Sequence, residues 1–222
     1  MFKTKWLVGT IALAALALSM STAPARAQEN NITVDARGGM AIPIGDAKQM
    51  WKAGPNAGIG VAYWFNPRIA VRVDGEADFL SGKSTGDLGS ISGGFNVPDM
   101  KLYHFGGGLV WRAMDPAASM WRITFNVGLG GTHMKSNDYP AGLTEPQPSE
   151  ANFSQTYWSG YGGVRIGYQF HPNISFSVGS QAHYVLTDHN DFMVFGQFIP
   201  GGSAQWNDFW TIPVQGQFTF HF

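Results

Sequence analysis

Ionisable side chains recur at every second residue in one stretch of this 222-residue sequence. Between Ile69 and Leu80, the residues Arg72, Asp74, Glu76 and Asp78 alternate with small or apolar residues. Side chains two residues apart in a β-strand point to the same face, so these four groups share a face. Guanidinium and carboxylate groups in such a row can form ion pairs or line a path for ions, and with a histidine they can move protons.

Other stretches carry polar residues in the same alternating manner. The residues out of phase with the apolar ones include Asp35, Arg37, Arg72, Asp74, Glu76, Asp78, His104, Arg112, Arg122, Arg165, Gln181, His183, Gln215 and Gln217. We predict that the charged residues of this set form one internal network: Asp35, Arg37, Arg72, Asp74, Glu76, Asp78, Arg112, Arg122 and Arg165. Five enclosed arginines are tolerable only when carboxylates and amides pair with them.

Eight alternating segments must position these side chains. They are Ile32–Pro43, Asn56–Phe65, Ile69–Leu80, Met100–Ala113, Trp121–Met134, Thr156–Phe170, Ile174–Thr187 and Phe209–Phe222. The connections alternate between short turns (66–68, 115–120 and 171–173) and long loops (44–55, 81–99, 135–155 and 188–208). An even number of strands with this loop asymmetry is typical of a transmembrane barrel. The sequence therefore predicts an all-β protein, an eight-stranded antiparallel up-and-down transmembrane β-barrel with its short turns in the periplasm and its long loops outside the cell.

The face opposite the charged residues is apolar and suits contact with lipid. On the third strand it consists of Ile69, Val71, Val73, Ala77 and Phe79, and bulky aromatics gather near the strand ends as two girdles do in such barrels. A water-soluble barrel of the lipocalin kind is the alternative, with the apolar face inside. The loop asymmetry and the aromatic last strand favour the membrane.

The last strand also resembles a known signal. Residues 210–222 alternate strictly, and Phe218, Phe220 and Phe222 share one face. This segment resembles the C-terminal strand of bacterial outer-membrane β-barrels. The resemblance implies that Phe218, Phe220 and Phe222 form an assembly signal read by the barrel assembly machinery.

Two further stretches, G-G-M-A-I-P-I-G-D at 38–46 and Y-W-F-N-P-R-I-A-V-R-V-D at 63–74, extend this resemblance. Together with the last strand they are similar to the small outer-membrane β-barrel family that includes porin-like and OmpA-like transmembrane domains. The resemblance implies location in the bacterial outer membrane, with outer-membrane lipids and lipopolysaccharide as partners. It does not imply cell-wall anchoring, because the sequence carries no peptidoglycan-binding domain after the barrel.

The N-terminal residues have the pattern of a secretory signal peptide. Lys3 and Lys5 precede an apolar run from Trp6 to Leu18, and Ala25-Arg26-Ala27 supplies a small-residue cleavage site. We therefore predict a cleaved signal peptide over residues 1–27 and a barrel domain over residues 28–222.

Composition excludes several classes of protein. Without residues 1–27, 11 basic residues face 15 acidic ones, so the net charge is about −4, which argues against binding to nucleic acid. Cysteine is absent, which excludes disulfides and thiolate metal sites. No stretch after residue 27 has the 18 consecutive apolar residues that a membrane-spanning helix needs. The sequence predicts no cofactor and no metal.

An eight-stranded barrel has an interior just wide enough for its own side chains. The balanced charges therefore predict an ion-paired plug, and a structural or surface-interaction role in the cell envelope. A narrow porin-like channel, or an OmpW-like conduit for small hydrophobic molecules, is the first alternative. A polar interior favours the plug over the conduit, which would need an apolar lumen with a lateral gap.

A lipid A-modifying enzyme is the second alternative, because some outer-membrane barrels use a histidine paired with serine or glutamate. His183 is followed by Tyr184 and Val185, not by the serine of a His-x-Ser motif. No nucleophile is close to His133 in sequence. We therefore predict no catalytic residues and no enzymatic activity.

The long loops could bind an extracellular ligand, because loop 135–155 is rich in proline and exposed loops commonly carry binding functions. Residues 188–191, Asp-His-Asn-Asp, could collect oxygen ligands for a divalent cation, and a solvated turn is the plainer interpretation. Gly82-Lys83-Ser84-Thr85 lacks the first glycine of a phosphate-binding loop, so nucleotide binding is not predicted.

Overall fold

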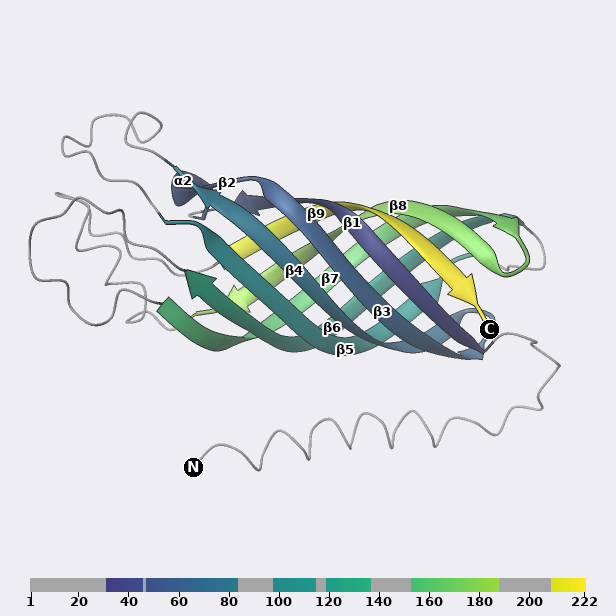
Figure 1. Ribbon diagram of the computed structural model, residues 1–222. Coiled ribbons are helices and arrows are strands. Elements are labelled where there is room, and N and C mark those ends of the chain that lie inside the picture. Colours follow the sequence, from purple (N-terminus) through teal and green to yellow (C-terminus); the bar gives the residue numbers. More distant parts are fainter. Residues whose placement is uncertain (1–30, 46, 84–97, 115–118, 137–152, 188–208) are drawn as a thin grey trace, which may run out of the picture.

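The computed structural model describes residues 31–45, 47–83, 98–114, 119–136, 153–187 and 209–222 (Figure 1). Its strands and its one helix are β1 (Ile32–Ile44), α2 (Ala47–Met50), β2 (Trp51–Lys52), β3 (Gly54–Asn66), β4 (Ile69–Gly82), β5 (Met100–Arg112), β6 (Trp121–Ser136), β7 (Phe153–His171), β8 (Ile174–Leu186) and β9 (Phe209–His221). In the described part of the chain, no helix is long and apolar enough to cross a membrane.

The eight long strands form a closed antiparallel barrel. Each pairs with its neighbours in the sequence, and β1 pairs with β9, as Val34 opposite Phe220 shows. The pairing of β4 with β5 completes the ring, so that no long strand is left with an unpaired edge. All strands run obliquely to the barrel axis (Figure 1). We name the two ends by their contents: α2 and β2 lie at the loop end, and the turns after β3 and β7 lie at the turn end with Phe222.

The predicted barrel is confirmed, and all eight predicted strands are present. Their ends differ from the prediction by a few residues, most at β7, which starts at Phe153 and stays paired with β6 as far as Ser136. The prediction of 44–55 as a plain loop is wrong. This segment contains α2 and β2, and Trp51 of β2 pairs with Gly82 of β4. One helical turn and two strand residues are too short to produce a periodic pattern.

Sequence chemistry accounts for the tight turn between β3 and β4. The side-chain Oδ1 of Asn66 accepts hydrogen bonds from the backbone amides of Arg68 and Ile69, at 2.8 and 2.9 Å. Asparagine commonly closes turns in this way, and Pro67 fixes the backbone between. The register of the charged face of β4 therefore follows directly from this turn.

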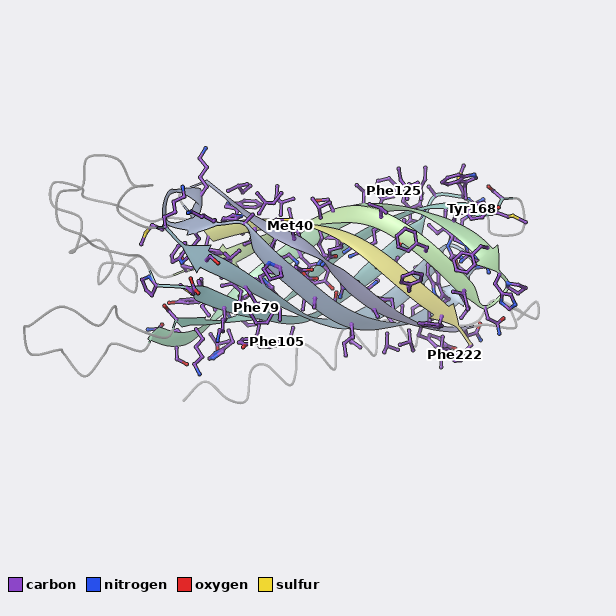
Figure 2. All side chains as sticks on the ribbon, turned by 45° about the horizontal axis from the view of Figure 1, so that its top comes forward. Met40, Phe79, Phe105, Phe125, Tyr168 and Phe222 are labelled. Carbon is purple, nitrogen blue, oxygen red and sulfur yellow. The ribbon has the colours of Figure 1, made fainter. Side chains whose placement is uncertain are left out.

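Side chains alternate between the interior and the outer surface along each strand. Apolar residues dominate the outer surface, where Ile59, Val73, Val127 and Leu129 are each more than 60% exposed. Figure 2 shows Phe79, Phe105, Phe125, Tyr168 and Phe222 on this outer surface. Since the large apolar residues of the strands cover the outer surface and the charged ones are buried, the lipocalin alternative, with its apolar face inside, does not apply.

Candidate functional site in the barrel interior

Two arginines and three carboxylates meet at the centre of the barrel. Arg37 lies 3.0 Å from Asp74 (Nη2 to Oδ2), 3.3 Å from Glu76 (Nη1 to Oε2) and 3.5 Å from Asp35 (Nε to Oδ1). Arg72 lies 2.7 Å from Asp35 (Nη2 to Oδ1) and 3.4 Å from Asp74 (Nε to Oδ2). All five side chains are at most 7% exposed. We call these five residues the central network.

Glycines on the intervening strand allow this contact between strands that are not neighbours. Asp35 and Arg37 come from β1 and the other three from β4, while β3 lies between them. Gly58 is the β3 residue that faces Arg37 and Glu76, and Gly60 faces Asp35. A Cβ atom on Gly60 would lie 2.3 Å from Nη2 of Arg72. The glycine spacing therefore creates the room in which β1 and β4 form ion pairs.

Histidines and amides surround the network on the side of the loop end. His183 Nε2 lies 3.3 Å from Glu76 Oε1, and its ring stacks on that of His104 with centroids 4.2 Å apart. His104 in turn contacts Asp78 (Nε2 to Oδ2, 3.2 Å) and Thr132 (Nδ1 to Oγ1, 2.7 Å). These groups are buried, and their contacts extend the central network toward the loop end.

Asn56 joins the two groups. Its amide donates to Glu76 Oε1 at 2.9 Å and to Asp78, and it accepts from Gln215 Nε2 at 2.5 Å. Asn56 has no formal charge, so charge balance alone did not single it out. Asn56 is two residues from Gly58 and four from Gly60, so it shares their inward face. This spacing is the sequence feature that could have identified it.

Arg165 is held by amides. Its Nη2 donates to Gln181 Oε1 at 2.8 Å and its Nη1 donates to Asn126 Oδ1 at 3.2 Å. Within the described residues, no carboxylate lies within 4.0 Å of this guanidinium. The amide oxygens accept its protons but supply no neutralising charge.

The structure does not bring Arg112 and Arg122 into the central network. Arg112 stacks over the ring of Trp64 at 3.9 Å and donates to the backbone oxygen of Pro67 at 3.0 Å. Arg122 donates to Gln169. Both lie near the turn end and line a cavity there. Sequence alternation correctly turns them inward, but it does not give their distance from the carboxylates.

The sequence predicts a polar interior, but the interior is apolar at the loop end. Trp51 and Phe209 meet there edge to face, with ring centroids 5.7 Å apart, and Trp51 Nε1 donates to the backbone oxygen of Pro98 at 3.1 Å. The apolar residues that pack here are Ala41, Ala47, Met50, Trp51, Leu80, Met100, Leu102, Met134, Tyr157, Val185 and Phe209. We call this cluster the apolar cap. Because α2 and β2 contribute to it, the strand pattern alone could not reveal it.

Tyr161 is a further interior residue that charge counting missed. Its ring lies beside inward glycines of β5 and β6, and a Cβ atom on Gly128 would lie 2.3 Å from its Cζ. The ring centroid of Tyr161 is 5.8 Å from that of His183. The glycines at 106, 108 and 128 therefore make room for an aromatic ring as well as for long charged side chains.

Outside the barrel, His133 has two hydroxyl neighbours from β7. Its Nδ1 lies 2.9 Å from Thr156 Oγ1, and its Nε2 lies 3.4 Å from Ser154 Oγ. Sequence distance concealed this pair, because residues 133 and 154 are brought together only by the β6–β7 register. Among the described residues, no group of three or more His, Asp or Glu side chains could hold a metal ion.

The remaining predicted site residues lie on the lipid-facing surface. Phe218, Phe220 and Phe222 are 51, 41 and 65% exposed and point outward from β9 and its end. Backbone hydrogen bonds join Phe222 to Ile32, from N to O at 2.9 Å and from Ile32 N to Phe222 O at 3.3 Å. The aromatic row thus lies along the seam where the first and last strands close. Residues 188–191, the candidate cation loop, lie outside the described residues.

A closed antiparallel barrel with an apolar outside and a charged inside defines a transmembrane β-barrel. The family model described as "Outer membrane protein beta-barrel domain" matches residues 12–218. The chain belongs to this family, and its place is the bacterial outer membrane. The match includes part of the predicted signal peptide, whose cleavage remains a prediction.

Solved structures with the same fold are also outer-membrane barrels. Neisserial surface protein A is 14% identical, with a TM-score of 0.55, over 86% of this chain and 97% of its own. OprG from Pseudomonas aeruginosa is 15% identical, with a TM-score of 0.50, over 87% and 98%. Similarity at this level shows a shared fold. No curated protein matches the sequence significantly.

Proposed function

We propose that this barrel is a non-conducting, non-enzymatic protein of the outer membrane, with a structural and surface-contact role in the cell envelope. The observation that carries the proposal is that side chains fill the lumen at two levels. The apolar cap fills the loop end, and the central network fills the middle. Arg37 alone contacts three carboxylates within 3.5 Å, which leaves little room for a solvated ion.

Conductance in a planar lipid bilayer tests this proposal. The full chain, purified from outer membranes in its compact unboiled form, should give a silent bilayer. Opening of the lumen would have to break the ion pairs of Arg37, at a cost of several kcal/mol. Discrete openings in the wild-type protein would support the porin-like alternative. The variant R37A/W51A, which removes the key side chain of each barrier, serves as the comparison and should conduct if it folds.

The partners that we propose lie on the outer surface and at the loop end. Outer-membrane lipids and lipopolysaccharide contact the apolar wall, and the barrel assembly machinery recognises Phe218, Phe220 and Phe222. An extracellular ligand bound by the long loops would complete the surface-contact role. The apolar exposure of the three phenylalanines at the β1–β9 seam supports the assembly part.

The contact of His133 with Ser154 favours a lipid hydrolase as a second candidate. The Nε2–Oγ distance of 3.4 Å is close to that of a nucleophile and its base, and the pair lies on the outer wall. Nδ1 of His133, the atom that an orienting carboxylate would contact, faces Thr156 Oγ1 instead. Mass spectrometry of lipid A from cells with the wild-type protein and with S154A decides between the candidates. Identical lipid A supports the non-enzymatic role, and a product lost in S154A supports the hydrolase.

A further inference from the structure

A cavity at the turn end of the barrel has more guanidinium groups than carboxylates among the described residues that line it. Its charged lining residues are Asp35, Arg72, Arg112, Arg122 and Arg165. Asp35, the one carboxylate of this lining, already lies 2.7 Å from Arg72 and 3.5 Å from Arg37. The described lining therefore has four guanidinium groups and one carboxylate that is in use.

Arg122 is the least compensated of these four arginines. It is 9% exposed, and its only side-chain hydrogen-bond partner in the described part of the chain is the neutral amide oxygen of Gln169. Its Nε has no hydrogen-bond partner among the described residues, and no carboxylate there lies within 4.0 Å of it. A buried guanidinium without a counter-charge is expensive. An anion at this position would remove that cost.

The wall beside Arg122 offers space and further hydrogen-bond donors. Gly167 is the cross-strand partner of Arg122 and has no side chain to fill the cavity. Thr33, Thr124, Ser175, Ser177 and Thr219 add hydroxyl groups to the lining. Guanidinium forks with hydroxyl donors are the groups that recognise phosphate and carboxylate oxygens. Trp64 supports Arg112 from behind by stacking, which orders a second charge at the same wall.

We propose that this cavity is an oxyanion-binding site, occupied from the turn end by the phosphate group of a small solute. Arg122 provides the principal contact, and Arg112 contributes charge. The site does not require a conducting lumen, because the central network closes the barrel beyond it. The inference is therefore independent of the proposed structural role.

Calorimetric titration with inorganic phosphate tests the site. The full-length protein is held in a non-ionic detergent at constant ionic strength, with chloride as the comparison anion. Saturable binding of about one phosphate per chain is expected. R122Q should lower the affinity about tenfold or more, because it removes a charge-assisted hydrogen bond. R68Q is the matched control, since Arg68 is exposed at the same end and lies outside the cavity lining; its affinity should equal that of the wild type.

Three outcomes would overturn the proposal. Phosphate binding that does not saturate would mean unspecific screening, and so would equal competition by chloride. Equal losses in R122Q and R68Q would show attraction by surface charge. Retention of the compact unboiled form on gels verifies that each variant is folded.

Discussion

Individual side chains of the central network depend on one another, and Glu76 is the one with the most varied contacts. It lies 3.3 Å from both Arg37 and His183, and it accepts a hydrogen bond from Asn56 at 2.9 Å. Arg37, which holds three carboxylates, is the reciprocal centre. Removing either partner leaves buried polar groups without a counter-charge, which lowers the free energy of unfolding. Exposed side chains of the same charge contribute little to that free energy.

We expect E76A to lower the free energy of unfolding by about 3 kcal/mol, because one contact of a buried guanidinium is lost. Urea unfolding in detergent micelles, followed by loss of the compact band on unboiled gels, measures the change. E76Q should lose less, since its amide oxygen can still accept from Asn56. R68A, at an exposed turn position, should change stability by less than about 0.5 kcal/mol. A stability of E76A equal to that of R68A would contradict the network.

Neighbouring strands are fitted to one another by small residues, and β5, β6 and β7 show this best. Gly106, Gly108, Gly128 and Gly130 face the ring of Tyr161 or the backbone of the paired strand. A Cβ atom on Gly128 would lie 2.3 Å from Tyr161 Cζ and 2.7 Å from the backbone oxygen of Gly107. The strands can approach at this point only without side chains.

We therefore expect G128A to destabilise the barrel by about 2 kcal/mol through overpacking. G160A is the matched control on β7, because the nearest atom to its Cβ would be Leu129 Cδ2, at an ordinary 3.6 Å. Melting temperatures in the same detergent, read from the loss of β-sheet circular dichroism, compare the two variants. Equal melting of G128A and the wild type would mean that the contact of β6 with Tyr161 is loose.

The sequence predicted the elements in which polar and apolar side chains alternate over ten or more residues. It missed the short elements that have no such pattern. The charged alternation of β4 and the short turn at 66–68 predicted the strand and its inward face correctly. The segment containing α2 and β2 could not be predicted, because burial of Trp51 against Phe209 joins residues more than 150 positions apart. The same limit applies to the site. The alternation of side chains along each strand predicted which residues point inward. The separation of Arg122 from the carboxylates depends on strand tilt and stagger, which the alternation does not give.

Over residues 28–222, lysine and arginine side chains occupy different parts of the barrel. Lys48, Lys52, Lys83, Lys101 and Lys135 are the five lysines of residues 28–222, and all belong to the loop end. The arginines line the interior, apart from Arg68 in a turn. Lys101 and Lys135 are direct cross-strand partners on β5 and β6, and like charges placed opposite one another are unfavourable. An external anion between them would reverse this repulsion.

The phosphate groups of lipopolysaccharide are the anions that an outward-facing loop end would meet in an outer membrane. We expect lipopolysaccharide added to phosphatidylcholine vesicles to raise the melting temperature of the wild-type barrel. K101E/K135E should lose most of this rise, because attraction becomes repulsion at the paired site. R68E, which changes charge at the opposite end, should keep it. Because the screening of exposed charges increases with salt, the rise should also shrink when ionic strength is raised from 0.01 to 1 M. An equal rise in both variants would mean that lipopolysaccharide stabilises the barrel through its acyl chains alone.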